Sequence, residues 1–219
     1  MFNIFLLYWR PLAFGEDEMA RRGKYSRDEI RNMALDAAEA IVAAEGYAGL
    51  SARKVAAAIG YTVGTLYLVF ENRNSLVLRI NGRTLDRLHE HLMTAISSAS
   101  AKKDAETTLI TLARAYIGHA ERETPLWNML FEYTTAQGDV MPDWYRRKLE
   151  HVFSHVEAAL RPLVGDEAET GRAARVLWAG VHGICTLKIR QRLDLSGGQS
   201  DEEMATMLIK TFLRGLRDR

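Results

Sequence analysis

The sequence has 219 residues, of which 47% are hydrophobic and 26% are charged, and its formal net charge at pH 7 is +1. These values are ordinary for a soluble globular protein and argue against a disordered or membrane-spanning chain. The single cysteine, Cys185, excludes an internal disulfide and a cysteine-rich metal site. It fits a reducing compartment, so we expect a cytoplasmic protein.

The small net charge conceals an uneven distribution along the chain. Residues 19–83 contain ten Lys or Arg against six Asp or Glu, whereas residues 84–219 contain eighteen against nineteen. A basic excess is expected of a segment that binds nucleic acid. The excess is modest, so it carries weight only together with a motif.

Residues 1–18 differ in character from the rest of the chain. They begin with the apolar run MFNIFLLYW, which is too short to span a bilayer and lacks the features of a signal peptide. The next segment, MARRGKYSRDEI, reads like a natural start, so we interpret residues 1–18 as a start-site artefact and place the start at Met19. The alternative is a genuine extension that docks on the body of the protein or on a membrane surface. We expect no stable membrane association.

Helical patterns occupy most of the remaining chain, without the alternation that is typical of strands. A capping box formed by Ser26 and Glu29 opens the first helix, and Gly46 ends it. Ser51 is expected to cap a short second helix, and a third short helix is expected over residues 63–69. These three helices would form a small N-terminal unit.

A longer helical region comes next. A long fourth helix is expected to start near Asn74, and about five more helices come after it. The last two are expected over residues of about 167–191 and 200–217, with a second capping box, Ser200 and Glu203, opening the final one. We therefore predict an all-α fold of about nine helices.

The segment GYTVGTLYLVF, residues 60–70, places small and hydroxyl-bearing residues at the start of the third helix. Two short helices joined at a glycine match helix-turn-helix geometry, in which the second helix enters the DNA major groove with its first turn. Gly64 would let the backbone approach closely, and Thr62 or Thr65 would donate to phosphates or base edges. The Tyr67 hydroxyl would reach a phosphate. Packing of the Tyr67 ring and capping by Thr65 remain alternatives.

The stretch SARKVAAAIGYTVGTLYLVFENRNSLV, preceded by ALDAAEAIVAAEGYAGL, resembles the DNA-binding domain of the TetR family of bacterial transcriptional regulators. The resemblance covers about Tyr25 to Arg79. It departs from the family pattern at Leu68 and Val69, which are apolar where many members carry a residue that reaches DNA. The resemblance implies a set of DNA-contacting residues, in which the two at the start of the second helix could also be a solvated face: Arg53, Lys54, Thr62, Gly64, Thr65, Tyr67, Arg73 and, in a basic arm, Lys24.

The stretch LWAGVHGICTL resembles a TetR subset marked by Trp178, His182 and Gly183, a likeness that covers about residues 105–216. Trp178 and His182 are four residues apart and share a helix face, with Gly183 permitting close packing. The resemblance implies that the body binds a small effector and forms a homodimer through its last two helices. The interface would bury apolar side chains of these two helices: Val176, Trp178, Ile184, Met207, Leu208 and Phe212.

Aromatic and histidine side chains of the body are the candidates for contact with an effector, which would then be mostly apolar. For most of them a place in the core is the competing interpretation. His151 and His155 share a helix face, but neither a metal nor a cofactor is expected, because no cysteine or carboxylate partner is evident. The candidate ligand-binding residues are Tyr116, Trp127, Phe131, Trp144, His155 and His182.

These patterns predict a helix-turn-helix DNA-binding domain at residues 19–72 and a helical effector-binding and dimerisation domain at residues 73–219. The expected function is a repressor that a small, mostly apolar effector releases from a palindromic operator in double-stranded DNA. An activator and an effector-independent DNA-binding dimer are the alternatives. No enzyme is expected, because the sequence lacks paired carboxylates, a nucleophile elbow, a phosphate loop and a metal-ligand cluster.

Overall fold

The computed structural model describes residues 25–98, 104–133, 141–193 and 200–217. These residues form nine α-helices, one short 3-10 helix and no strand, which confirms the predicted all-α fold. The expectations for the N-terminal extension and for Lys24 fall outside the described residues.

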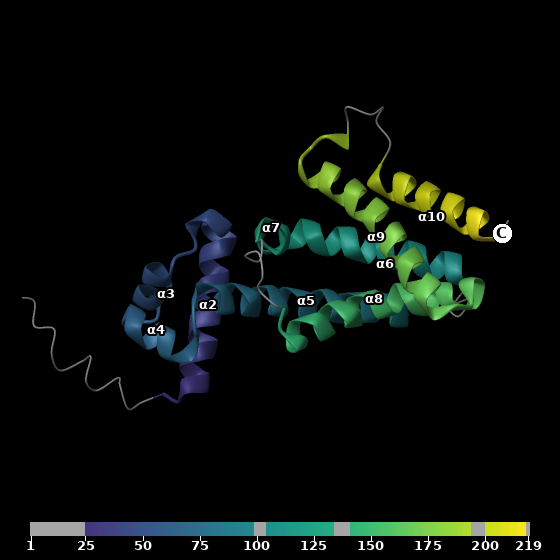
Figure 1. Cartoon of the computed structure of the whole chain (residues 1–219). Helices are drawn as coiled ribbons and strands as arrows, with labels where there is room; N and C mark the ends of the chain where they lie inside the picture. Colours follow the sequence, from purple (N-terminus) through teal and green to yellow (C-terminus); the bar gives the residue numbers. More distant parts are fainter. Residues whose placement is uncertain (1–24, 99–103, 134–140, 194–199, 218–219) are drawn as a thin grey trace, which may run out of the picture.

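The first three helices gather at one end of the molecule, opposite the C-terminus (Figure 1). The predicted capping box opens the first of them: the Ser26 amide donates to Glu29 at 2.7 Å, and the Glu29 amide donates to the Ser26 hydroxyl at 3.2 Å. Gly46 ends it with a φ of 72°. A 3-10 turn, η1 (Tyr47–Gly49), leads to the next two helices. The three helices are α2 (Arg27–Glu45), α3 (Ala52–Ala58) and α4 (Val63–Val69).

A hydrophobic cluster holds these helices together, and it extends beyond residue 72. Val55 of α3 and Leu66 of α4 pack with α2, because each helix turns its apolar stripe inward. The cluster also contains residues of the first two turns of α5 (Arg73–Ser98) and one side chain from a distant helix, Met129. The N-terminal unit is therefore completed by helices that come later in the chain.

The remaining helices form the body, and α5 runs from the N-terminal unit along it (Figure 1). The second predicted capping box is confirmed, since the Ser200 amide donates to Glu203 at 3.0 Å and the Glu203 amide donates to the Ser200 hydroxyl at 3.1 Å. A second, larger hydrophobic cluster fills the body. The helices after α5 are α6 (Ala105–Arg122), α7 (Thr124–Glu132), α8 (Asp143–Val164), α9 (Glu167–Ile189) and α10 (Asp201–Arg217).

Close packing of α8 on α5 depends on Gly82. A side chain added at this residue would place its Cβ 2.9 Å from the Trp144 ring and 3.4 Å from the Lys148 side chain. Among the described helices, none combines the length and the apolarity needed to cross a membrane.

Candidate functional site

The helix-turn-helix segment folds as predicted, with α4 lying partly exposed. Gly60 has a φ of 73°, a conformation that favours glycine and lets the chain turn sharply between α3 and α4. One side of α4 is anchored in the N-terminal cluster by Leu66 and Phe70, each 1% exposed. The opposite side presents Thr62, Gly64 and Tyr67 to solvent. The structure thus brings the predicted recognition residues together on one exposed helix.

The two threonines at the start of α4 bond to each other. The Thr62 hydroxyl caps the helix by accepting a hydrogen bond from the Thr65 amide at 3.2 Å. The two hydroxyl oxygens are 3.1 Å apart, so one hydroxyl donates to the other. The pair consequently keeps a single O–H group with which to donate to another molecule. Capping is performed by Thr62, whereas Thr65 provides the capped amide.

Cationic side chains lie at the first turns of the helices before and after α4. Arg53 and Arg73 are exposed. The Arg73 guanidinium donates to the Tyr47 hydroxyl at 3.3 Å and lies over the Tyr47 ring, 5.2 Å from its centroid. The Lys54 ammonium forms an ion pair with Glu45, which partly neutralises its charge. Arg53 and Arg73 are therefore the stronger candidates for phosphate contacts.

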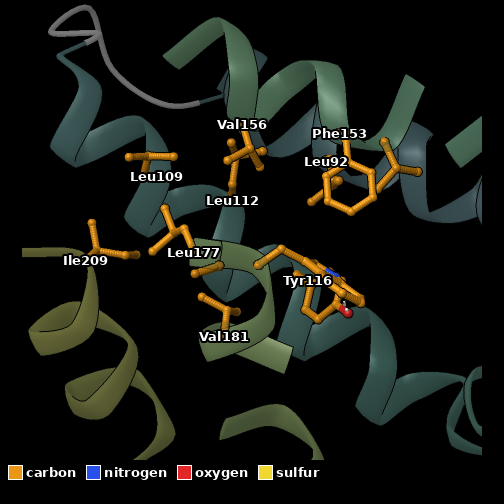
Figure 2. Close-up of a pocket in the computed structure, with 12 residues that line it drawn as sticks. Leu92, Leu109, Leu112, Tyr116, Phe153, Val156, Leu177, Val181 and Ile209 are labelled. Atoms are coloured by element: carbon orange, nitrogen blue, oxygen red, sulfur yellow. Dashed lines mark hydrogen bonds between the residues drawn. The ribbon is translucent and has the colours of Figure 1, made fainter. Parts of the chain in front are cut away.

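The body contains a small apolar cavity of about 40 Å³, to which five helices contribute walls (Figure 2). Figure 2 shows aliphatic side chains on most sides, with the Tyr116 ring at one end. The lining residues are Leu92 of α5, Leu109, Leu112, Ala113 and Tyr116 of α6, Val152, Phe153 and Val156 of α8, Leu177, Trp178 and Val181 of α9, and Ile209 of α10.

A hydrogen-bonded chain of aromatic side chains borders the Tyr116 end of the cavity. The Trp178 indole donates to the Tyr116 hydroxyl at 2.9 Å, and the Tyr116 oxygen is 3.0 Å from His182 Nδ1. Since the indole can only donate, the Tyr116 O–H group is free to donate to Nδ1. The protonated Nε2 of His182 then faces the Thr186 hydroxyl at 3.4 Å. The polar atoms beside the cavity are thus largely satisfied within the protein.

These groups carry no charge at neutral pH. Burial raises the pKa of Tyr116 well above its ordinary value and lowers the pKa of His182, because both charged forms would lose hydration. Burial also raises the pKa of the Cys185 thiol to about 12, which makes this side chain a poor nucleophile. The cavity therefore suits an uncharged, apolar occupant.

The structure separates the six predicted ligand-binding residues into three groups. Tyr116 lines the cavity. Trp127, Phe131 and His182 form an aromatic cluster beside it, with ring centroids 5.3 Å apart for Trp127 and Phe131 and 4.3 Å apart for Phe131 and His182. The remaining two lie elsewhere: Trp144 packs under the Arg79 guanidinium, and His155 lies 3.0 Å from His89.

Most of the cavity wall is aliphatic, and the sequence interpretation missed it by selecting aromatic and histidine side chains. Leu109, Leu112 and Tyr116 repeat at helical spacing, which identifies an inward face of α6. Such a repeat does not distinguish a cavity wall from a filled core, because the difference depends on side chains of other helices. Among the residues that the structure describes, no group of three or more His, Cys, Asp or Glu side chains is placed to hold a metal ion.

The short helix α7 has two apolar faces that belong to different clusters. Trp127 is 2% exposed and packs in the body, where its ring meets Tyr116 edge-on at a centroid distance of 4.7 Å. Met129 is fully buried in the N-terminal cluster, against which Leu126 and Tyr133 also pack. At the start of α7, Glu123 accepts from Arg87 at 2.9 Å, and Arg87 also donates to Glu39 of α2 at 3.1 Å. Helix α7 therefore joins the cavity region to the N-terminal unit.

The outer face of α9 and α10 exposes apolar side chains. Val176 is 63% exposed and Met207 is 62% exposed, and Leu187 is also exposed. Gly183 lies on this outer face, where an added Cβ would have no neighbour within 4 Å, so it does not serve the close packing expected of it. Of the residues predicted for the interface between subunits, Trp178 and Ile184 point inward, to the cavity and the core.

Comparisons with known proteins agree with this architecture. Residues 34–80 match the family described as "Bacterial regulatory proteins, tetR family", and residues 109–212 match "Tetracyclin repressor-like, C-terminal domain". No curated protein matches the sequence significantly.

Three solved structures illustrate the shared fold. A protein of unknown function from Rhodococcus sp. RHA1 is 23% identical with a TM-score of 0.70, and 94% of this chain and 98% of that chain are covered. A putative transcriptional regulator from Pseudomonas aeruginosa PAO1 is 19% identical with a TM-score of 0.60, covering 92% and 96%. The TetR family regulator PfmR from Thermus thermophilus is 19% identical with a TM-score of 0.53, covering 83% and 97%.

Proposed function

Since the chain belongs to the TetR family of transcriptional regulators, which bind DNA and are not enzymes, we propose that it is a repressor released from its operator by a small, apolar effector. In this proposal α4 is the recognition helix, the cavity of the body takes the effector, and two copies of the chain act together. The observation that supports an effector response most directly is the position of α7, which packs in both hydrophobic clusters.

The proposed dimer uses the outer face of α9 and α10. The exposed side chains of Val176, Leu187 and Met207 form apolar surface on these two helices, and Gly183 would let a partner helix approach. A twofold dimer buries the same patch on both subunits. Two recognition helices related by this axis would meet half-sites about one DNA turn, roughly 34 Å, apart. The operator is accordingly expected to be palindromic.

The proposed effector is uncharged and mostly apolar. The cavity of about 40 Å³ is smaller than a drug-sized molecule requires, so binding would displace side chains of its wall. Tyr116 at the end of the cavity contacts Trp127 of α7, whose other face holds Met129 in the N-terminal cluster. An effector that favours a different position of Tyr116 would thereby favour a different position of α7. It shifts the equilibrium only by its difference in affinity for the two arrangements.

Selection of bound sequences from a random DNA pool by the purified full chain tests the DNA-binding part of the proposal. We expect a palindromic consensus and, on this consensus, binding at least about tenfold weaker for Tyr67→Ala. Tyr67 is 43% exposed, so the variant should fold, which circular dichroism checks. Absence of a consensus, with binding that disappears at moderate salt, would mean attraction to phosphates alone and would contradict the proposal.

Retardation of the selected operator in the presence of naphthalene, decanol or decanoate tests the effector response. The two uncharged probes should release DNA from the wild type, and the carboxylate should do so less well, because the cavity offers no charge to pair with it. Ala113→Leu fills the cavity wall and should reduce release by both probes while leaving operator binding intact. If probes quench tryptophan fluorescence without changing the retardation, the cavity binds ligands but the proposed response is wrong. A promoter that is silent without the protein and active with it would identify an activator.

A further inference from the structure

Leu68 on α4 is 67% exposed, more than any other large apolar side chain among the residues that the structure describes. Its neighbours in the helix are anchored: Leu66 and Val69 lie in the N-terminal cluster. Helix α4 is thus fixed by its inner side chains, and Leu68 contributes little to that packing. An isolated exposed leucine needs no explanation in general, but this one lies on the face of the predicted recognition helix.

The polar groups available on α4 are few. Thr62 and Thr65 bond to each other and retain one O–H donor between them. Val63 and Gly64 provide no polar side-chain atom. The Tyr67 hydroxyl is the other polar group on the exposed side of the helix. Because several hydrogen-bonding groups are normally needed to distinguish base pairs by their edges, α4 is poorly equipped for recognition of this kind alone.

Gly64 and Leu68 lie one turn apart and therefore share a face of α4. Long side chains of a helix lean toward its N-terminus, so the Leu68 methyl groups lean toward the position of Gly64. An added Cβ at Gly64 would meet one described neighbour, the Thr62 hydroxyl, at 3.6 Å, which is an ordinary contact. The backbone at Gly64 and the methyl groups of Leu68 together form an open apolar step.

We propose that Leu68 recognises the 5-methyl group of thymine in each half-site of the operator. This inference rests on the proposed function, since it requires α4 to lie in the major groove. Each thymine presents one methyl group there, and apolar side chains contact it. The cationic side chains of Arg53 and Arg73, in the turns before and after this helix, complement the phosphates on either side of such a groove.

Replacement of thymine by uracil tests the proposal, because uracil lacks only the methyl group. In the selected operator, each thymine of a half-site is replaced in turn together with its symmetry mate, and binding is compared for the wild type and Leu68→Ala. For at least one position, the wild type should bind about fourfold more weakly for each methyl group removed, and about tenfold or more for the pair. Leu68→Ala should bind the thymine and uracil versions of that operator equally.

Tyr67→Phe is the matched control. It removes a polar contact from the adjacent residue and should weaken binding to both operators while keeping the difference between thymine and uracil. Indifference of the wild type to every uracil replacement, a consensus without thymine, or an unchanged uracil effect in Leu68→Ala would each overturn the inference while leaving the proposed function standing. Failure to select any consensus would instead overturn both.

Discussion

The exposed face of α4 and the cavity of the body differ in how far the folded chain accounts for their residues. At the cavity, Tyr116, Trp178 and His182 satisfy one another by hydrogen bonds. On α4, neither the glycine at residue 64 nor the exposed Leu68 is explained by a contact within the chain. The first region is thus complete in the isolated subunit, whereas the second is shaped for contact with another molecule.

The difference also explains what each region can bind. A polar ligand in the cavity would have to break hydrogen bonds that already exist, whereas an apolar one would not. The surface of α4 has no such bonds to lose beyond the Thr62–Thr65 pair. Helix α7 connects the two regions, so a change in α7 tests the connection itself. Two glycines with contrasting surroundings, Gly82 and Gly64, test the regions separately and with smaller effects.

The largest effect is expected at Met129, the α7 residue that is fully buried in the N-terminal cluster. Met129→Ala removes apolar contacts and leaves a cavity, so the free energy of unfolding should fall by about 2–5 kcal/mol. Urea denaturation followed by circular dichroism measures it. Met93→Ala, at an exposed position of α5, is the control and should change stability by no more than about 0.5 kcal/mol. Equal losses in the two variants would mean that α7 does not support the N-terminal unit.

Local features of the N-terminal unit could be predicted closely from the sequence. Ser26, Gly46 and Ser51 mark helix ends through short-range hydrogen bonds and backbone conformation, so their roles depend on adjacent residues alone. The bounds of α4 were predicted for the same reason. The division of the chain at residue 72 remains a prediction, and the N-terminal cluster crosses it through α5 and α7.

The cavity could not be predicted in the same way. Its wall combines side chains from five helices, and whether they meet or leave a space depends on how those helices pack. Aromatic content pointed to Tyr116 correctly as a lining residue, but it also pointed to Trp144, which packs against Gly82 on α5 instead. The two faces of α7 were not predicted either, since Trp127 and Met129 are distinguished only by their distant neighbours.

The next effect concerns acid. Burial lowers the pKa of His119 to about 4, with Glu123 opposing the shift and the cationic groups of His91, Arg122 and Arg87 adding to it. The unfolded chain, with an ordinary His pKa of 6.5, binds the proton more readily, so stability is present above this value and is lost as the pH falls toward 4. The loss should reach up to about 3 kcal/mol. His119→Gln should flatten this part of the profile of unfolding free energy against pH.

The matched control for the acid effect is His151→Gln, at an exposed position, which should keep the loss. Tyr116, Trp127 and His119 lie in one buried region, where the Trp127 and His119 rings are 6.1 Å apart. An unchanged pH profile in His119→Gln would assign the acid sensitivity to other groups.

A smaller loss is expected at Gly82, where helix packing requires glycine. An added Cβ would lie 2.9 Å from the Trp144 ring, so α8 or the ring must shift. The strain should exceed the better helix propensity of alanine, with a net loss of about 1 kcal/mol for Gly82→Ala. Urea denaturation measures the loss, and a change in tryptophan fluorescence would show that the ring has moved. Stabilisation would mean that α5 and α8 can separate without penalty.

Gly64→Ala should have the smallest effect on stability and the opposite sign. The added Cβ meets the Thr62 hydroxyl at an ordinary 3.6 Å, and alanine favours a helix over glycine, so the free energy of unfolding should rise by up to about 1 kcal/mol. Binding to the selected operator should nevertheless weaken, because the methyl group occupies the surface that faces the DNA. The two measurements together are decisive, since a variant that is more stable and binds less well cannot owe its defect to misfolding. A gain in stability with unchanged binding would place the DNA on another part of α4, and Leu68 would then lose its proposed partner as well.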